Sequence, residues 1–164
     1  MAVNNSHQVN EGVKSPKSIT YEVNRIEYFN MIQGIVTRMA SNSFAIKNWC
    51  IAITSGMLGI TTWKFEDWRA YLLILIPILM FWYLDSYYLQ QERLFRGVYD
   101  RVRLMSDEQL KNSNYSLIPP RKGDPDYKKS YKMINVFFSK TELVLYGNLM
   151  LIATIIILVI YFTK

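Results

Sequence analysis

An uncharged hydrophobic run near the end of the chain constrains the fold more than any other feature of the sequence. The segment from Leu143 to Phe162, LVLYGNLMLIATIIILVIYF, contains no charged residue and is followed by Lys164. A helix needs ~20 apolar residues to cross the hydrocarbon core of a bilayer, and this run has that length. The sequence therefore predicts a transmembrane helix over residues 143–163.

A second hydrophobic block runs from Ala70 to Leu84. It reaches spanning length only if its helix continues past Asp85 to Tyr88, where several aromatic rings suit a headgroup boundary. Pro77 lies inside this block and is expected to kink the helix without ending it, because neighbouring helices can satisfy the freed carbonyl.

A third block, from Phe44 to Trp63, is less apolar and is rich in Ala, Ser, Thr and Gly. It is long enough to span if Lys47 extends its alkyl stem and holds its ammonium near the interface. The residues KFEDWR at 64–69 then leave room only for a tight helical hairpin between the first two spans.

The fold class that follows is an all-α integral membrane protein with three transmembrane helices, of which the first two extend into the cytoplasm. The 164 residues are 51% hydrophobic, but these residues are concentrated in the three blocks, as in a small membrane protein. The predicted segments are a flexible tail over 1–20, an amphipathic helix continuing into the first transmembrane helix over 21–63, a hairpin tip over 64–69, a second transmembrane helix continuing into a cytoplasmic helix over 70–105, a cytoplasmic basic linker over 106–142, and the third transmembrane helix over 143–163.

Basic residues near the ends of the spans predict the orientation of the chain, whose net charge is +6. The side with the N-terminus and the central region carries Arg38, Lys47, Arg93, Arg96, Arg101, Arg103, Lys128, Lys129, Lys132 and Lys140, whereas the other side has only Lys64, Arg69 and Lys164. We therefore expect a cytoplasmic N-terminus and central region, with the hairpin tip and the C-terminus outside.

Helical periodicity predicts how far the first two helices continue beyond the membrane. Apolar residues recur at three- and four-residue steps before the first span, namely Ile26, Phe29, Ile32, Val36 and Met39. After the second block an apolar stripe continues at steps of three, four and seven residues, namely Leu84, Tyr88, Phe95, Val98 and Val102. Glu92, Arg96 and Asp100 are expected on the opposite face of the second helix. The residues SDEQ at 106–109 resemble a capping box that opens a short helix, and three prolines at 119–125 predict irregular structure after it.

The face of the first helix opposite its apolar stripe repeats every seven residues. Gly34, Ser41, Asn48, Ser55 and Thr62 form one series, and Arg38, Ala45, Ala52 and Gly59 form a second. A seven-residue repeat marks a seam that faces a partner helix or a symmetry axis. The candidate pore-lining residues, here called the seam, are Gly34, Arg38, Ser41, Asn48, Ala52, Ser55, Gly59 and Thr62.

Two interpretations of the seam stay open. Small residues let helix backbones approach closely in lipid, so the seam could only pack against a neighbouring helix. Alternatively, identical helices surround an axis and the polar side chains wet a pore when it opens. Arg38 is then either an interfacial anchor or part of an electropositive ring at the cytoplasmic mouth.

Basic residues of the first helix and of the central region are candidates for binding an anionic ligand. They are Arg38, Arg93, Arg96, Arg101, Arg103, Lys122, Lys128 and Lys129. Cations interleaved with Tyr127 and Tyr131 in the segment RKGDPDYKKSYK suit phosphates and bases, as in single-strand nucleic-acid grooves. A juxtamembrane basic segment of this kind also contacts anionic lipid and fixes topology.

No residue pattern supports catalysis, so the chain is not expected to be an enzyme. With one cysteine and one histidine it has no Cys/His cluster for a metal, and no cofactor motif is present. Asp85 and Glu142 are expected to be solvated or paired at span boundaries, and not to form a paired-carboxylate site. Asn148, inside the last block, is expected to bond to another helix.

The stretch EYFNMIQGIVTRMASNSFAIKNW, the hydrophobic hairpin after it and FWYLDSYYLQQERLFRGVYDRVR resemble small bacterial membrane proteins from anti-phage defence loci. Among these are the Hailong-type channel effector and, more loosely, the two-span pore-forming effectors of nucleotide-signalling systems. The resemblance covers about residues 21–105. It implies an oligomeric channel in the bacterial inner membrane that depolarises the infected cell when open, and is toxic for that reason. It also implies control by a nucleotide or short DNA oligomer that a partner nucleotidyltransferase makes.

The partners expected are therefore the lipid bilayer, further copies of the chain, with a tetramer as one option, and this signal. The alternative is a non-conducting membrane anchor or scaffold that recruits a cytosolic partner enzyme through residues 85–142. An accessory subunit of a membrane enzyme or transporter also fits the size of the chain, but no particular residue supports it.

Overall fold

The computed structural model describes residues 16–64 and 67–163, which form helices joined by one long linker and include no strand. This confirms the all-α prediction for the described part of the chain. The predicted flexible tail lies outside the described residues up to position 15, but residues 16–20 belong to α1 (Pro16–Lys64). Proline is tolerated at this place because the first turn of a helix does not use its backbone N–H groups.

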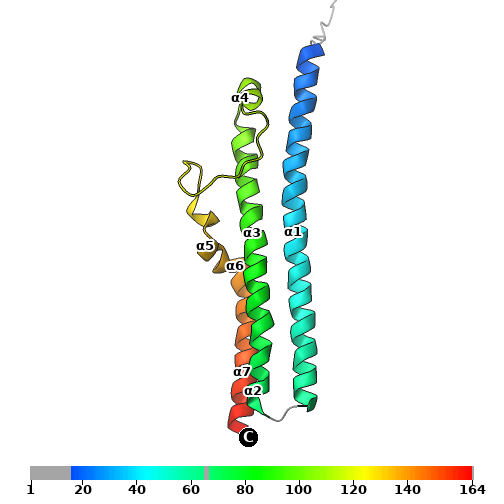
Figure 1. The fold of residues 1–164 in the computed structure, drawn as a ribbon, viewed down its shortest axis with the longest axis vertical. Helices are drawn as coiled ribbons and strands as arrows, with labels where there is room; N and C mark the ends of the chain where they lie inside the picture. Colours follow the sequence, from blue (N-terminus) through cyan, green and yellow to red (C-terminus); the bar gives the residue numbers. More distant parts are fainter. Residues whose placement is uncertain (1–15, 65–66, 164) are drawn as a thin grey trace, which may run out of the picture.

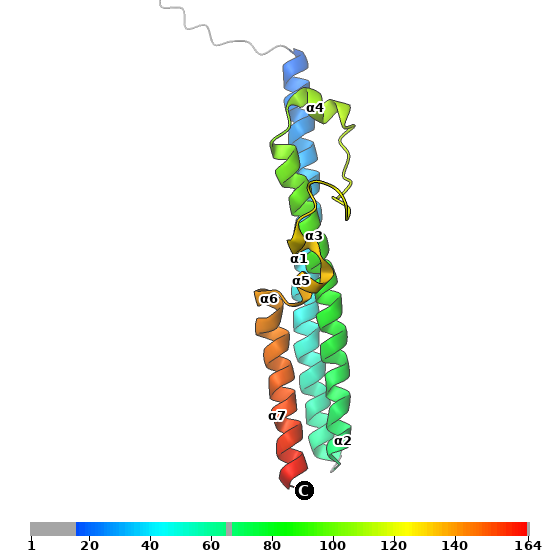
Figure 2. The same ribbon diagram turned by 90° about the vertical axis from the view of Figure 1, so that its left-hand side faces the viewer.

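A long antiparallel helix pair forms the body of the molecule (Figures 1 and 2). α1 runs unbroken for 49 residues and pairs along its length with α3 (Leu75–Arg103). α2 (Trp68–Tyr71) and the 3-10 turn η1 (Leu72–Ile74) lead into α3, so that residues Trp68–Arg103 are one helix of 36 residues. At 1.5 Å per residue this helix is about 54 Å long, well beyond the ~30 Å core of a bilayer.

Pro77 does not end the helix, as expected, and the helix tightens into the 3-10 turn η1 just before it. Pro77 has no N–H to donate to the carbonyl of Leu73, four residues earlier, and Leu73 lies within η1. The helix starts two residues earlier than expected because Asp67 caps it, its carboxylate accepting the backbone N–H of Arg69 at 3.0 Å.

The last helix packs beside the pair at its hairpin end, where α1 ends and α2 begins (Figure 2). α6 (Lys140–Glu142), the π-helical turn η3 (Leu143–Gly147) and α7 (Asn148–Thr163) form one continuous helix. The C-terminus lies at the same end of the molecule as the hairpin (Figure 1). Asn148 does not bond to another helix as expected: its side chain is exposed and donates to the carbonyl of Val144, one turn earlier, at 2.5 Å.

Two helices of the described chain are long and apolar enough to cross a membrane, Trp68–Arg103 and Lys140–Thr163. α1 is not one of them, because Lys47, Asn48 and several Ser, Thr and Gly residues lower its hydropathy. The structure therefore shows two candidate spans, and the three predicted are not shown.

The linker between α3 and α6 contains α4 (Asp107–Asn112), the 3-10 turn η2 (Lys129–Tyr131) and α5 (Met133–Phe137). The predicted capping box at Ser106 and Gln109 is confirmed, since each side chain accepts the other residue's backbone N–H. Tyr28 of α1 donates to the carbonyl of Ser116 at 2.5 Å. Burial raises the pKa of Tyr28, against a smaller lowering effect of the Arg101 charge, so the phenol stays a donor.

From residue 126 on, the linker is bound along one side of α3. The side chains of α3 that hold it reach its backbone carbonyls or its acidic groups: Trp82 Nε1 donates to Phe137 O at 3.1 Å, Gln90 Nε2 to Tyr131 O at 2.7 Å and Arg93 Nη1 to Ser130 O at 3.2 Å, and Arg101 pairs with Asp126 at 2.8 Å. Glu92, expected on an exposed face, is buried and pairs with Arg96 at 2.7 Å. It is buried because the linker and α1 leave little of α3 open at that level.

At Gly97 the linker packs directly against the backbone of α3. A Cβ built on Gly97 would collide with the hydroxyl of Tyr131, a residue that is itself buried. Alanine raises helix propensity by about 1 kcal/mol over glycine, but overpacking a filled site costs about 1–3 kcal/mol.

We expect Gly97→Ala to loosen residues 126–137, seen as faster amide hydrogen exchange there. Combining it with Tyr131→Phe should recover part of the protection, because the colliding oxygen is gone. Unchanged exchange in Gly97→Ala would show that the tyrosine moves aside freely.

Candidate functional site

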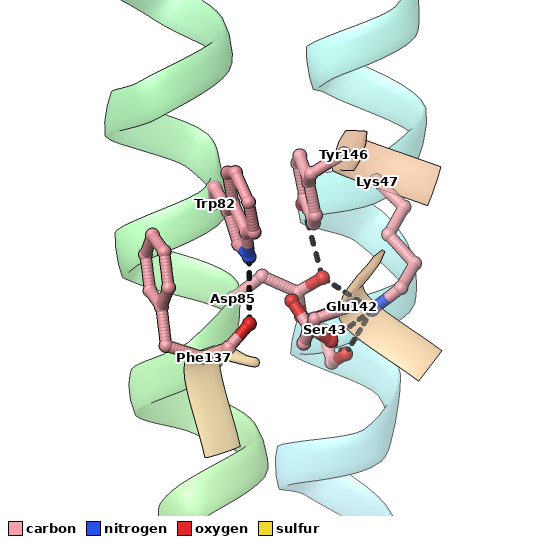
Figure 3. A network of polar contacts seen from close by, with 7 residues as sticks. All are labelled: Ser43, Lys47, Trp82, Asp85, Phe137, Glu142 and Tyr146. Atoms are coloured by element: carbon pink, nitrogen blue, oxygen red, sulfur yellow. Dashed lines mark hydrogen bonds and ion pairs between the residues drawn. The ribbon is translucent and has the colours of Figure 1, made fainter. Parts of the chain in front are cut away.

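The most unusual site in the described chain is a cluster of buried polar side chains where three helices meet (Figure 3). It consists of Ser43 and Lys47 from α1, Asp85 from α3, Glu142 from α6 and Tyr146 from η3, here called the charge cluster. It lies between two hydrophobic clusters, one around Ile32, Val98 and Leu110 and one around Cys50, Ile78 and Trp82 at the hairpin end. Polar residues thus interrupt a core that is apolar on both sides.

Each member of the charge cluster occupies a position in the buried stripe of its helix. Ser43 and Lys47 are one turn apart on α1, and Asp85 lies three residues after the buried Trp82 on α3. Glu142 and Tyr146 are also one turn apart. Helical periodicity therefore turns all five side chains toward the helix junction.

Asp85 is the centre of the hydrogen bonding. Its side chain is 0% exposed and accepts from the Ser43 hydroxyl, from the Lys47 ammonium and, at 3.0 Å, from the Tyr146 hydroxyl. Lys47 also donates to the Ser43 hydroxyl at 2.9 Å. With three donors, the Asp85 carboxylate is well compensated for the loss of water.

Glu142 is compensated much less. Its side chain is also 0% exposed, yet one oxygen lies 3.5 Å from the Lys47 ammonium and the other, Oε2, has no hydrogen-bond partner. The cluster holds two carboxylates and one ammonium, so with both acids ionised it carries one uncompensated negative charge. Lys47 is therefore the residue on which the stability of both carboxylates depends.

The charge cluster ties the last helix to the first. On the hairpin side of the cluster, α1 and α7 leave an apolar hollow between them, lined among others by Leu58, Tyr71 and Ile156. Direct packing between α1 and α7 is incomplete there. The link from Lys47 to Glu142, and that from Asp85 to Tyr146, supply the polar part of the junction.

The pairing of Asp85 and Glu142 was one of the two expected states, but their meeting in one site was not expected. Lys47 was expected only to hold its ammonium near the membrane interface, whereas both carboxylates are buried around this one lysine. A signal was present, because each of the three apolar blocks has one ionisable residue at its end away from the hairpin. Among the described residues, no group of three or more His, Cys, Asp or Glu side chains could hold a metal ion.

The seam lies on a different surface. All eight residues of the seam are exposed on α1, and the helix continues without a break through Lys47. Asn48 faces outward immediately after the inward-facing Lys47. The seam is therefore an open face of the single chain, separate from the charge cluster, and only its residue Ser55 also lines the apolar hollow between α1 and α7.

The candidate ligand residues do not converge on one site. Arg38 is exposed on α1 and Arg103 at the end of α3, while Lys122, Lys128 and Lys129 are exposed in the linker. Arg93, Arg96 and Arg101 are engaged with the linker or with Glu92, as described above. Arg101 and Lys128 line one hollow, but Asp100 and Asp126 line it too, so its charge is balanced.

No family model, curated protein or solved structure matches this chain. The resemblance to anti-phage membrane effectors therefore stays a prediction. What supports a function is the geometry of α1 and of the charge cluster.

Charge counting predicts the order of stability of three variants. Lys47→Met leaves two buried carboxylates with no cation and should lower the free energy of unfolding by about 3 kcal/mol or more. Glu142→Gln removes the uncompensated charge and should change it by less than about 1 kcal/mol. Lys64→Met, at the exposed end of α1, should be nearly neutral. Denaturant unfolding in detergent micelles measures all three, and a Glu142→Gln loss as large as that of Lys47→Met would refute the charge count.

Proposed function

We propose that this protein is a homo-oligomeric membrane channel in which α1 lines the axis. The observation that carries the proposal is the open seam: a face of α1 made of small and polar residues that are all exposed in the described chain. In the proposed arrangement the N-terminus lies in the cytoplasm of a bacterium, the C-terminus lies outside, and all three helices cross the inner membrane.

The position of α1 supports its crossing of the bilayer. Its residues 47–64 lie beside the apolar parts of the two candidate spans, and the charge cluster joins all three helices at one level (Figures 2 and 3). If α3 and α7 cross a bilayer, this part of α1 lies at the same depth. A moderately polar helix at that depth needs a surface other than lipid for its polar side.

The glycines of α1 support contact between copies. A Cβ built on Gly34, Gly56 or Gly59 would meet nothing within 4 Å. Each glycine inside a helix costs about 0.5–1 kcal/mol relative to alanine, and nothing within the described chain requires that small size. A second backbone packed against this face would require it, as small residues do where membrane helices approach closely.

The polar members of the seam suit both states of a gated pore. Asn48, Ser55 and Thr62 are seven residues apart, so they stay in line along a helix that packs against its own copies. They can lie close together when the helices are packed and form a hydrophilic wall when the helices separate. Acyl chains would offer these groups no hydrogen-bond partner.

Control by a signal extends the proposal. Arg38 is exposed on the seam, so copies arranged around an axis would bring their Arg38 side chains into one electropositive ring. Such a ring attracts phosphates. Together with the resemblance to defence effectors, it supports a nucleotide or short DNA oligomer as the signal, and depolarisation of the infected cell as the outcome.

Ion flux from liposomes tests conduction. The purified protein should release an ion trapped in the liposomes in at least one of two conditions, with or without short DNA oligomers of mixed sequence. Thr62→Leu should lose most of this flux, because a bulky apolar side chain would replace a hydroxyl on the pore wall. Thr154→Leu is the matched control: Thr154 is exposed on α7, and like Thr62 it donates to a carbonyl of its own helix.

Absence of flux in every condition, with normal insertion, would favour the non-conducting scaffold. Expression of the chain alone separates the two functions in cells. A channel should collapse the membrane potential and stop growth, whereas a scaffold should be tolerated.

A further inference from the structure

We propose that α5 and the lysines around it form a membrane-surface anchor that binds anionic phospholipid. The anchor comprises residues 128–140, and its ligand is a lipid with a net negative headgroup together with the first part of its acyl chains. The inference goes beyond conduction, since it requires only that α3 and α7 cross a bilayer.

One side of the anchor is fixed to α3. Val136 is fully buried, and the Phe137 ring is stacked on Trp82 with centroids 4.2 Å apart. Trp82 also donates its indole N–H to the Phe137 carbonyl (Figure 3). α5 is therefore held rigidly in one orientation on the side of the helix pair.

The other side of α5 is apolar and open. Ile134 is 59% exposed and Phe138 is 55% exposed, although both belong to the same short segment as the buried Val136. Moving a fully exposed side chain of this size out of water gains about 1.5–3 kcal/mol. A pair of such side chains, presented by a rigid backbone, is a surface that favours an apolar environment.

The depth of α5 indicates which apolar environment this is. Phe138 contacts Trp82 as well, edge to face at 6.3 Å, and Trp82 lies on the hairpin side of the charge cluster. The candidate span Lys140–Thr163 begins two residues after Phe138. Figure 1 shows α5 beside α3 directly above the start of α6. The exposed side chains of Ile134 and Phe138 are therefore level with the beginning of the spans, where headgroups meet acyl chains.

The charges around α5 select anionic lipid. Residues 127–140 contain Lys128, Lys129, Lys132 and Lys140, all exposed, and no acidic residue. Each basic side chain near an anionic membrane surface contributes about 1 kcal/mol of attraction, which a zwitterionic surface does not supply. Ile134 lies between Lys132 and Lys140. Its aliphatic side chain suits the acyl chains of a lipid, whereas the bases of a nucleic acid stack on aromatic rings.

Site-directed spin labelling tests the anchor on the full chain. In a Cys50→Ala background, a nitroxide is placed at Ile134→Cys and the protein is reconstituted in liposomes of phosphatidylcholine, with or without phosphatidylglycerol. We expect the label to become more accessible to oxygen and less to a water-soluble nickel complex when phosphatidylglycerol is present. The double variant Lys132→Gln/Lys140→Gln should lose most of this difference.

Two further positions make the outcome decisive. Ile118→Cys is a matched control, because Ile118 is equally exposed but lies beside the end of α3 away from the hairpin, near Val102, and its label should stay in water. Val159→Cys, exposed on α7, should report lipid in every preparation.

A lipid-exposed label at 159 with a water-exposed label at 134 in both liposomes would overturn the anchor alone. Water at both positions would overturn the membrane placement and the anchor together. Protection at 134 by a short DNA oligomer, and not by phosphatidylglycerol, would overturn the lipid assignment.

Discussion

The ammonium of Lys47, held between two buried carboxylates, is the interaction on which the arrangement of the helices depends. In a bilayer, apolar surfaces gain little by packing on each other, since lipid tails serve them as well as a neighbouring helix does. The apolar hollow between α1 and α7 shows how little direct packing joins these two helices. A buried charge, unlike an apolar surface, cannot exchange its partner for lipid. Asp85 and Glu142 are stable inside the protein only while Lys47 is close.

The charge cluster also fixes how α1 is rotated about its own axis. Ser43 and Lys47 must face the helix junction to reach Asp85, and the seam is then turned away from α3. Lys47 and Asn48 show this directly, since neighbouring residues in a helix point about 100° apart and these two lie on different surfaces of α1. The same ion pair that holds the three helices together therefore leaves a slender, polar face of α1 open. The exposed side of α5 belongs to another element, so the proposed lipid contact there would not compete with the proposed contact between copies.

Local patterns in the sequence predicted the elements well and their long-range contacts poorly. Periodicity located the long helices, and the spacing of Ser106 and Gln109 predicted a cap that the structure contains, because these features depend on residues within a few turns. Pro16 was placed outside the helix although the first turn accepts it. The charge cluster joins Lys47 to residues 38 and 95 positions away, and no local rule selects such partners. The prediction for Asn148 was wrong for the opposite reason: it expected a bond to another helix, but the amide donates to a carbonyl one turn away in its own helix.

If copies of the chain pack through the seam, the free-energy costs of separating the helices indicate where a gating motion would occur. Separating α1 from α3 within one chain would break a buried charge pair, at a cost of about 3–5 kcal/mol for each chain. Separating neighbouring copies would expose Ser, Thr, Asn and Gly, groups that water solvates readily. The lower resistance lies between chains, so each protomer would move as a rigid body around the axis. Control from the cytoplasm then needs only a ligand that bridges or repels the N-terminal halves of α1, where Arg38 lies, and the charge cluster stays intact in both states.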